Sequence, residues 1–142
     1  MHITDKYGRC SIEIKYNFDE SSGYDSFSFH ANVDIGHGLF SAKNEDVHFF
    51  DLPTFVAQLD AFILDQTIQP CLNGTYDSFL SLSGTPSSVN LRFCVADGFS
   101  GYKQVNTPFA LTGAFDIEPD LLFSVLTHFR EMLESWRSCR SV

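Results

Sequence analysis

The chain has 142 residues, of which 44% are hydrophobic and 19% charged, and its formal net charge is −9 at pH 7. This length is typical of one domain, so a single domain over residues 1–142 is expected, and the composition excludes a disordered or fibrous chain. The 18 acidic residues against 9 Lys and Arg argue against nucleic acid or an anionic membrane as a partner, because both require positive charge.

Three strands are predicted at the start of the chain. Residues 11–18 alternate apolar and polar side chains, and residues 26–35 do the same. This alternation is typical of strands with one buried face. A third, less regular strand is expected between Leu39 and Phe50.

The first helix is expected over residues 52–65. Pro53 falls in its first turn, and Asp51 stands at the N-cap position, where a carboxylate often accepts backbone N–H groups. Apolar side chains recur at helical spacing and predict one buried face, formed by Phe55, Val56, Leu59, Phe62 and Ile63.

A similar order of elements follows in the second half of the chain. Asn73-Gly74 is interpreted as a hairpin turn, and strands are expected over residues 79–82, 89–95 and 102–117. Pro119 begins the last predicted helix. Its buried stripe is expected to consist of Leu122, Val125, Leu126, Phe129, Met132, Leu133 and Trp136.

These elements have the order βββα-βββα. Strands with one polar face need another layer to cover their apolar face. The sequence therefore predicts an α+β fold with two layers, in which two helices pack on one face of a mostly antiparallel sheet.

No sequence signature indicates catalysis or metal binding. A phosphate-binding glycine-rich loop, a zinc-protease helix and a nucleophile elbow are all absent. His30 and Asp34 share the polar face of one strand, but a separation of about 13 Å prevents them from binding one metal ion directly. We therefore expect no catalytic residues, no metal and no cofactor, and we do not expect an enzyme.

The cysteines and the N-terminal residues favour a cytoplasmic protein. The N-terminal stretch shows no apolar segment of a secretory signal. The four cysteines have no metal-knuckle spacing, so free thiols are expected at Cys10, Cys71, Cys94 and Cys139.

The negative charge is concentrated in the middle of the chain. Eleven acidic residues lie between Tyr16 and Tyr102, with only Lys43 and Arg92 as bases. Two interpretations stay open: a soluble acidic surface without a target, or a docking face for a basic protein. A docking face would steer a positively charged partner and raise its association rate.

Three stretches of the sequence carry a resemblance. They are Phe49-Phe50-Asp51-Leu52-Pro53-Thr54-Phe55 leading into Leu59 and Phe62, Val95-Ala96-Asp97-Gly98-Phe99-Ser100-Gly101, and Phe115 with the helix from Leu121 to Leu133. Together they resemble the WapI-like immunity proteins of bacterial toxin systems, over roughly residues 47–135. The chain departs from that family in one loop, where Tyr102 follows Gly101 and the family often has a Gly-His pair.

The resemblance implies a small, acidic, cytoplasmic protein that binds and blocks one cognate toxin domain. A basic toxin, such as a nuclease, is the implied partner. On this hypothesis the acids supply charge and exposed aromatic side chains act as anchors. The predicted contact residues are Asp34, Glu45, Asp46, Asp60, Asp65, Asp77, Tyr76 and Phe99.

A second hypothesis is a small-molecule-binding domain or enzyme, with a phenylalanine-lined pocket between sheet and helices. Its support is the 15 phenylalanines, which ordinary core packing also explains. Nothing in the sequence indicates a homo-oligomer.

Overall fold

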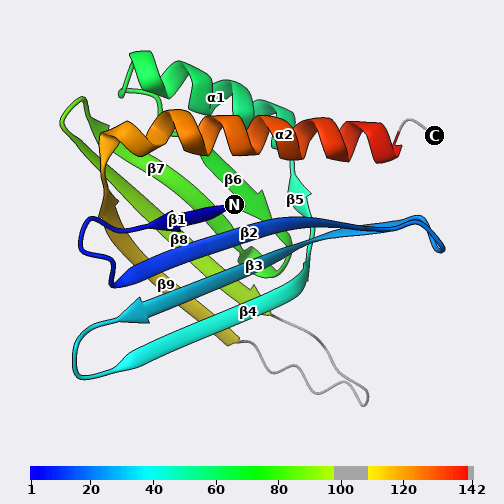
Figure 1. The fold of residues 1–142 in the computed structure, drawn as a ribbon, viewed down its shortest axis with the longest axis horizontal. Helices are drawn as coiled ribbons and strands as arrows, with labels where there is room; N and C mark the ends of the chain where they lie inside the picture. Colours follow the sequence, from blue (N-terminus) through cyan, green and yellow to red (C-terminus); the bar gives the residue numbers. More distant parts are fainter. Residues whose placement is uncertain (98–108, 141–142) are drawn as a thin grey trace.

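The strands form two antiparallel sheets, and both helices lie along one side of them (Figure 1). The computed structural model describes residues 1–97 and 109–140. Sheet 1 consists of β1 (His2–Thr4), β2 (Cys10–Asp19), β3 (Tyr24–Asp34) and β4 (Leu39–Val47). Sheet 2 consists of β5 (Phe49–Phe50), β6 (Cys71–Gly74), β7 (Phe79–Thr85), β8 (Ser88–Asp97) and β9 (Phe109–Ile117). The helices are α1 (Leu52–Leu64) and α2 (Leu122–Arg140).

The structure confirms the α+β class and, in outline, the predicted order of strands and helices. The strands are divided between two sheets, however, where the sequence predicted one. Each strand pairs with its neighbour in the chain except at one point, between β4 and β5, where the chain passes from sheet 1 to sheet 2. Alternation shows which face of a strand is buried but not which strands pair, so it did not reveal this break.

One local prediction is wrong, and another is confirmed only in part. Asn73-Gly74 is not a hairpin turn but the end of β6, paired with Phe50 and Phe49 of β5. A Cβ at Gly74 would lie 3.0 Å from the Phe49 side chain, so close packing explains the glycine there. Asp51 occupies the N-cap position of α1 but makes no side-chain cap, because its backbone is left-handed with φ 55°.

The apolar faces of both sheets and both helices form one core. Its largest fully buried side chains include five phenylalanines: Phe29, Phe55, Phe62, Phe93 and Phe129. α1 and α2 lie side by side (Figure 1). The Phe55 and Phe129 rings join them, with centroids 4.9 Å apart. At the surface of the same contact, Arg130 lies 3.0 Å from Asp60.

A buried polar junction joins the two sheets where β4 lies against β8. The side chain of Asn44 donates a hydrogen bond to the Ala96 carbonyl at 2.9 Å. Ser78 accepts from the Ala96 N–H at 3.2 Å and donates to the same carbonyl at 3.3 Å. Ala96 lies past the end of the β7 pairing, so these side chains supply partners that a neighbouring strand would otherwise provide.

Neither helix within residues 1–97 and 109–140 has the length and apolar character needed to cross a membrane.

Candidate functional site

Tyr24, Asp46 and His48 meet where β3 begins and β4 ends. The Tyr24 hydroxyl donates a hydrogen bond to the Asp46 carboxylate and lies 3.0 Å from Nε2 of His48. His48 Nε2 is also 3.3 Å from the Asp46 carboxylate. The two rings stand edge to face with centroids 5.6 Å apart. Each of the three side chains therefore contacts the other two.

A tight turn, Thr75–Asp77, is joined to the backbone of His48 and places Tyr76 close enough to Tyr24 to affect its titration. The His48 carbonyl accepts from Thr75 N–H at 3.0 Å, and His48 N–H donates to the Thr75 hydroxyl at 3.1 Å. Tyr76 and Asp77 both have left-handed backbones, with φ 59° and 63°. This conformation is uncommon for residues other than glycine and often occurs at functional positions. We call Tyr24, Asp46, His48, Tyr76 and Asp77 the aromatic–acidic cluster.

The hydrogen bond between Tyr24 and Asp46 depends on the tyrosine hydroxyl staying protonated. This hydrogen bond raises the pKa of Tyr24, and desolvation and the charge of Asp46 act in the same direction. The Tyr24 hydroxyl therefore remains a donor to Asp46 at neutral pH and above.

The cluster exposes aromatic surface beside negative charge. Tyr24 is 51% exposed and Tyr76 is 37% exposed, and Phe50, two residues after His48, is 57% exposed. Aromatic side chains with an apolar body and a polar tip are enriched at protein interfaces, where they supply most of the binding energy. This combination is suited to binding another protein.

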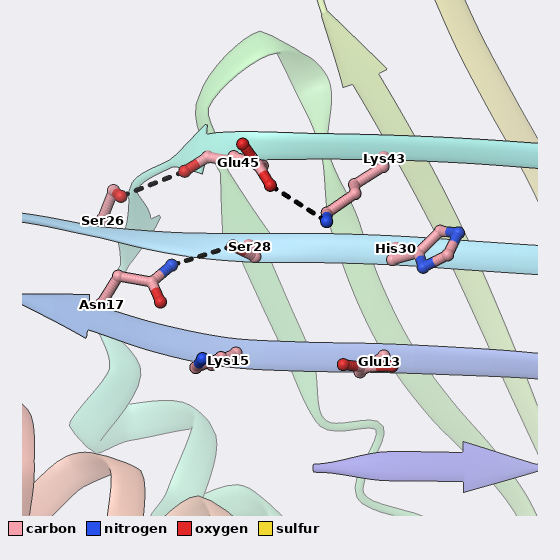
Figure 2. A pocket seen from close by; sticks show the side chains of 8 residues that line it. All are labelled: Glu13, Lys15, Asn17, Ser26, Ser28, His30, Lys43 and Glu45. Carbon is pink, nitrogen blue, oxygen red and sulfur yellow. Dashed lines mark hydrogen bonds and ion pairs between the residues drawn. The ribbon is translucent and has the colours of Figure 1, made fainter.

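A second feature is a polar hollow on the outer face of sheet 1, with a volume of about 490 Å³ (Figure 2). Figure 2 shows that alternate side chains of β2, β3 and β4 line it. Asn17 donates to the Ser28 hydroxyl at 2.8 Å, and Lys43 lies 3.0 Å from Glu45. The lining residues are Glu13, Lys15, Asn17, Ser26, Ser28, His30, Lys43 and Glu45.

A β-bulge in β4 directs the consecutive acids Glu45 and Asp46 to different partners. Phe27 pairs with Val47 and Phe29 with Asn44, so β4 has one extra residue between two inward side chains. Glu45 contacts Lys43 at the hollow, whereas Asp46 contacts Tyr24 in the cluster.

The structure brings together only some of the predicted contact residues. Asp46, Tyr76 and Asp77 belong to the aromatic–acidic cluster, and Glu45 lies at the hollow beside it. Asp34 ends β3, ten residues and roughly 33 Å along the strand from Tyr24.

The remaining predicted residues lie elsewhere. Asp60 on α1 is paired with Arg130. Asp65 follows α1 and accepts hydrogen bonds from the hydroxyl and N–H of Thr67, which lower the pKa of its carboxyl. Phe99 is outside the described residues.

Tyr24 and His48 were not among the predicted contact residues. Tyr24 has the same parity as Ser26, Ser28 and His30, so the strand pattern extended by two residues places it on the polar face. The presence of an aromatic residue, Tyr24, on the polar face of a strand was the sequence signal that could have identified it as a contact residue. No sequence signal connects His48 with Tyr24, because the pairing of β3 with β4 brings them together.

Several core phenylalanines within the described residues pack on one another. Phe27 and Phe29 pack on Phe49 with ring centroids 5.1 and 5.8 Å away, and Phe93 packs on Phe115 at 6.1 Å. Among the described residues, no group of three or more His, Cys, Asp and Glu could hold a metal ion.

The four cysteines have free thiols of unequal accessibility, which predicts unequal reactivity. Burial raises the pKa of the Cys94 thiol, and the charge of Asp77 raises it further, whereas Cys71 is exposed. Because a raised pKa leaves less of the reactive thiolate, alkylation at about pH 8 should modify Cys71 first and Cys94 much later. Mass spectrometry of a time course measures this order. Modification of Cys94 as fast as Cys71 would contradict it, and the unfolded protein should react at all four.

Comparison with known proteins found no relative of this chain. No model of a protein family matches it, and neither the curated proteins nor the solved structures contain a match.

Proposed function

We propose that this chain is a small cytoplasmic binding protein of the immunity type, which binds and inhibits a cognate basic toxin domain. The observation that supports this proposal best is the aromatic–acidic cluster, in which exposed tyrosines stand beside the Asp46 carboxylate and Asp77 lies in the adjoining turn. The resemblance of the sequence to WapI-like immunity proteins supports the same function.

The cluster has the properties needed to bind a basic surface. Asp46 and Asp77 attract cationic side chains, and Tyr24 and Tyr76 offer ring faces on which a guanidinium or ammonium can stack. The overall charge of −9 adds a long-range attraction that raises the association rate. Tyr24 is held by Asp46 and His48, so little side-chain freedom remains to be lost on binding.

The charge of Asp46 should act mainly on encounter with the partner. With the purified cognate toxin domain, to be sought among the products of neighbouring genes, Asp46→Asn should slow association by about two- to fivefold at low salt and reduce its salt dependence. Stopped-flow mixing at several salt concentrations measures both. Asp34→Asn, the matched control, makes the same charge change far from the cluster and should have a smaller effect. Equal effects of the two variants would show that only net charge matters and would remove the cluster from the interface.

Tyr24 should affect mainly the rate at which the complex with the toxin domain dissociates. Tyr24→Ala removes an anchor that is already ordered, so the complex should dissociate about tenfold faster while association changes little. Tyr7→Ala is the control, since Tyr7 is 81% exposed and lies in the turn between β1 and β2, which contributes nothing to the cluster. If the wild-type chain does not bind or inhibit the toxin domain, the immunity function itself is wrong.

A further inference from the structure

The polar hollow on sheet 1 holds two lysines together with two glutamates. The chain has 9 Lys and Arg in total, and Lys15 and Lys43 both line this hollow. They come from β2 and β4, the strands on either side of β3, and His30 of β3 stands between those strands (Figure 2). The volume of about 490 Å³ is in the range of small-molecule sites.

The two lysines differ in their present partners. Lys43 lies 3.0 Å from Glu45, but both side chains are more than half exposed, so this ion pair is weak. Lys15 has no ion-pair partner within the part of the chain that the structure describes. The Lys15 ammonium is therefore available to an anion above β3, and the Lys43 ammonium becomes available when it leaves its weak pair with Glu45.

Hydroxyl and amide groups complete the hollow between the lysines. Ser28 is the register partner of Lys15 and accepts a hydrogen bond from the Asn17 amide at 2.8 Å. Because the Ser28 oxygen accepts this bond, its hydroxyl proton can be donated to a bound anion. Ser26 donates to the Glu45 carbonyl at 3.1 Å, which leaves its oxygen as an acceptor.

The lining also limits the kind of ligand. All eight lining residues are polar, and His30 is the one among them with an aromatic ring, so the hollow offers no apolar surface for burying a lipid chain. Lysine ammonium groups bind phosphate as point charges, and no arginine is among the lining residues. The carboxylates of Glu13 and Glu45 at the margin can accept hydrogen bonds from ligand hydroxyls.

We propose that this hollow binds a phosphorylated sugar, with the phosphate between Lys15 and Lys43 over Ser28 and the sugar hydroxyls toward the glutamates. The net negative charge of the chain does not prevent this. Charges beyond about 8 Å are largely screened at physiological salt, so the groups that line the hollow decide the affinity.

The test is a titration followed by NMR of the backbone amides, with ribose 5-phosphate, inorganic phosphate and unphosphorylated ribose as separate probes. Ribose 5-phosphate should give saturable shifts confined to β2, β3 and β4. Inorganic phosphate should bind the same strands more weakly, and ribose should cause no shifts. Equal affinity for inorganic phosphate and ribose 5-phosphate would overturn the sugar part of the proposal. No saturable shift with either would overturn the site.

Two substitutions in the hollow should change the affinity for ribose 5-phosphate in opposite directions, and a third serves as the control. Lys15→Gln should weaken binding of ribose 5-phosphate about tenfold, because it removes a charge-assisted hydrogen bond. Glu45→Gln should strengthen binding, since it frees Lys43 and removes repulsion of the anion. Lys6→Gln, in the turn before β2, is the matched control and should leave the affinity unchanged. A loss with Lys6→Gln as large as with Lys15→Gln, or weaker binding with Glu45→Gln, would contradict the proposed phosphate position.

Discussion

Replacing Phe129 by alanine is expected to lower the free energy of unfolding by about 3–5 kcal/mol. Phe129 is fully buried in α2, and its ring packs on Phe55 of α1. Its removal leaves a cavity between the two helices that rigid neighbours fill only in part, so both transfer energy and packing are lost. Urea unfolding followed by circular dichroism measures the change.

Phe123→Ala is the matched control on the same helix. Phe123 is 67% exposed, so its replacement should change the free energy of unfolding by less than about 0.5 kcal/mol. Both variants replace phenylalanine by alanine, which has the higher helix propensity, so this contribution is the same in both. The difference between their unfolding free energies therefore measures the effect of burial. A loss below about 1 kcal/mol at Phe129 would mean that α1 and α2 do not pack as described.

Replacing Asn44 by alanine is expected to cost about 1–3 kcal/mol of unfolding free energy. The Asn44 amide donates to the Ala96 carbonyl across the two sheets, and its oxygen accepts the Asp46 N–H at 2.9 Å. Alanine leaves the Asp46 N–H without this partner and the Ala96 carbonyl with only the longer bond from Ser78. Urea unfolding again gives the change.

Asn90→Ala distinguishes the buried junction from the general effect of losing an asparagine. The Asn90 side chain bonds the Asp116 carboxylate at the surface, at 3.1 Å, so its loss should change stability by less than about 0.5 kcal/mol. Asn44→Ala should also change the amide NMR shift of Asp46, because the Asn44 side chain accepts the Asp46 N–H in the bulge. The contact between Asp46 and the Tyr24 hydroxyl should weaken as a result. An Asn44 variant as stable as the Asn90 variant would show that the junction does not hold the sheets together.

Much of the secondary structure follows from the sequence alone. The alternation over residues 11–18 corresponds to β2, and the helical spacing from Phe55 to Ile63 corresponds to α1. These patterns are local: whether one face of an element is apolar depends only on the order of side chains along it. The buried stripe of the last helix was predicted correctly from Leu122 to Leu133 for the same reason.

The candidate site was only partly predictable. Acidity in the middle of the chain and the exposed Tyr76 can be read from the sequence, but Asp34, Asp60 and Asp65 were grouped with Asp46 only because they share its charge. The fold separates them. Asp34 lies at the opposite end of β3 from Tyr24, which contacts Asp46, and Asp60 and Asp65 lie in and directly after α1.

Tertiary structure alone decided three features: the division into two sheets, the bulge that turns Asp46 toward Tyr24, and the meeting of His48 with the Thr75–Asp77 turn. Each depends on contacts between residues more than ten positions apart in the chain. Such contacts are selected by the packing of the whole core and by the need to pair every buried polar group. A local pattern of side chains carries neither kind of information. The sequence by itself therefore determined which segments form strands and helices, and the tertiary structure decided which side chains meet at the surface.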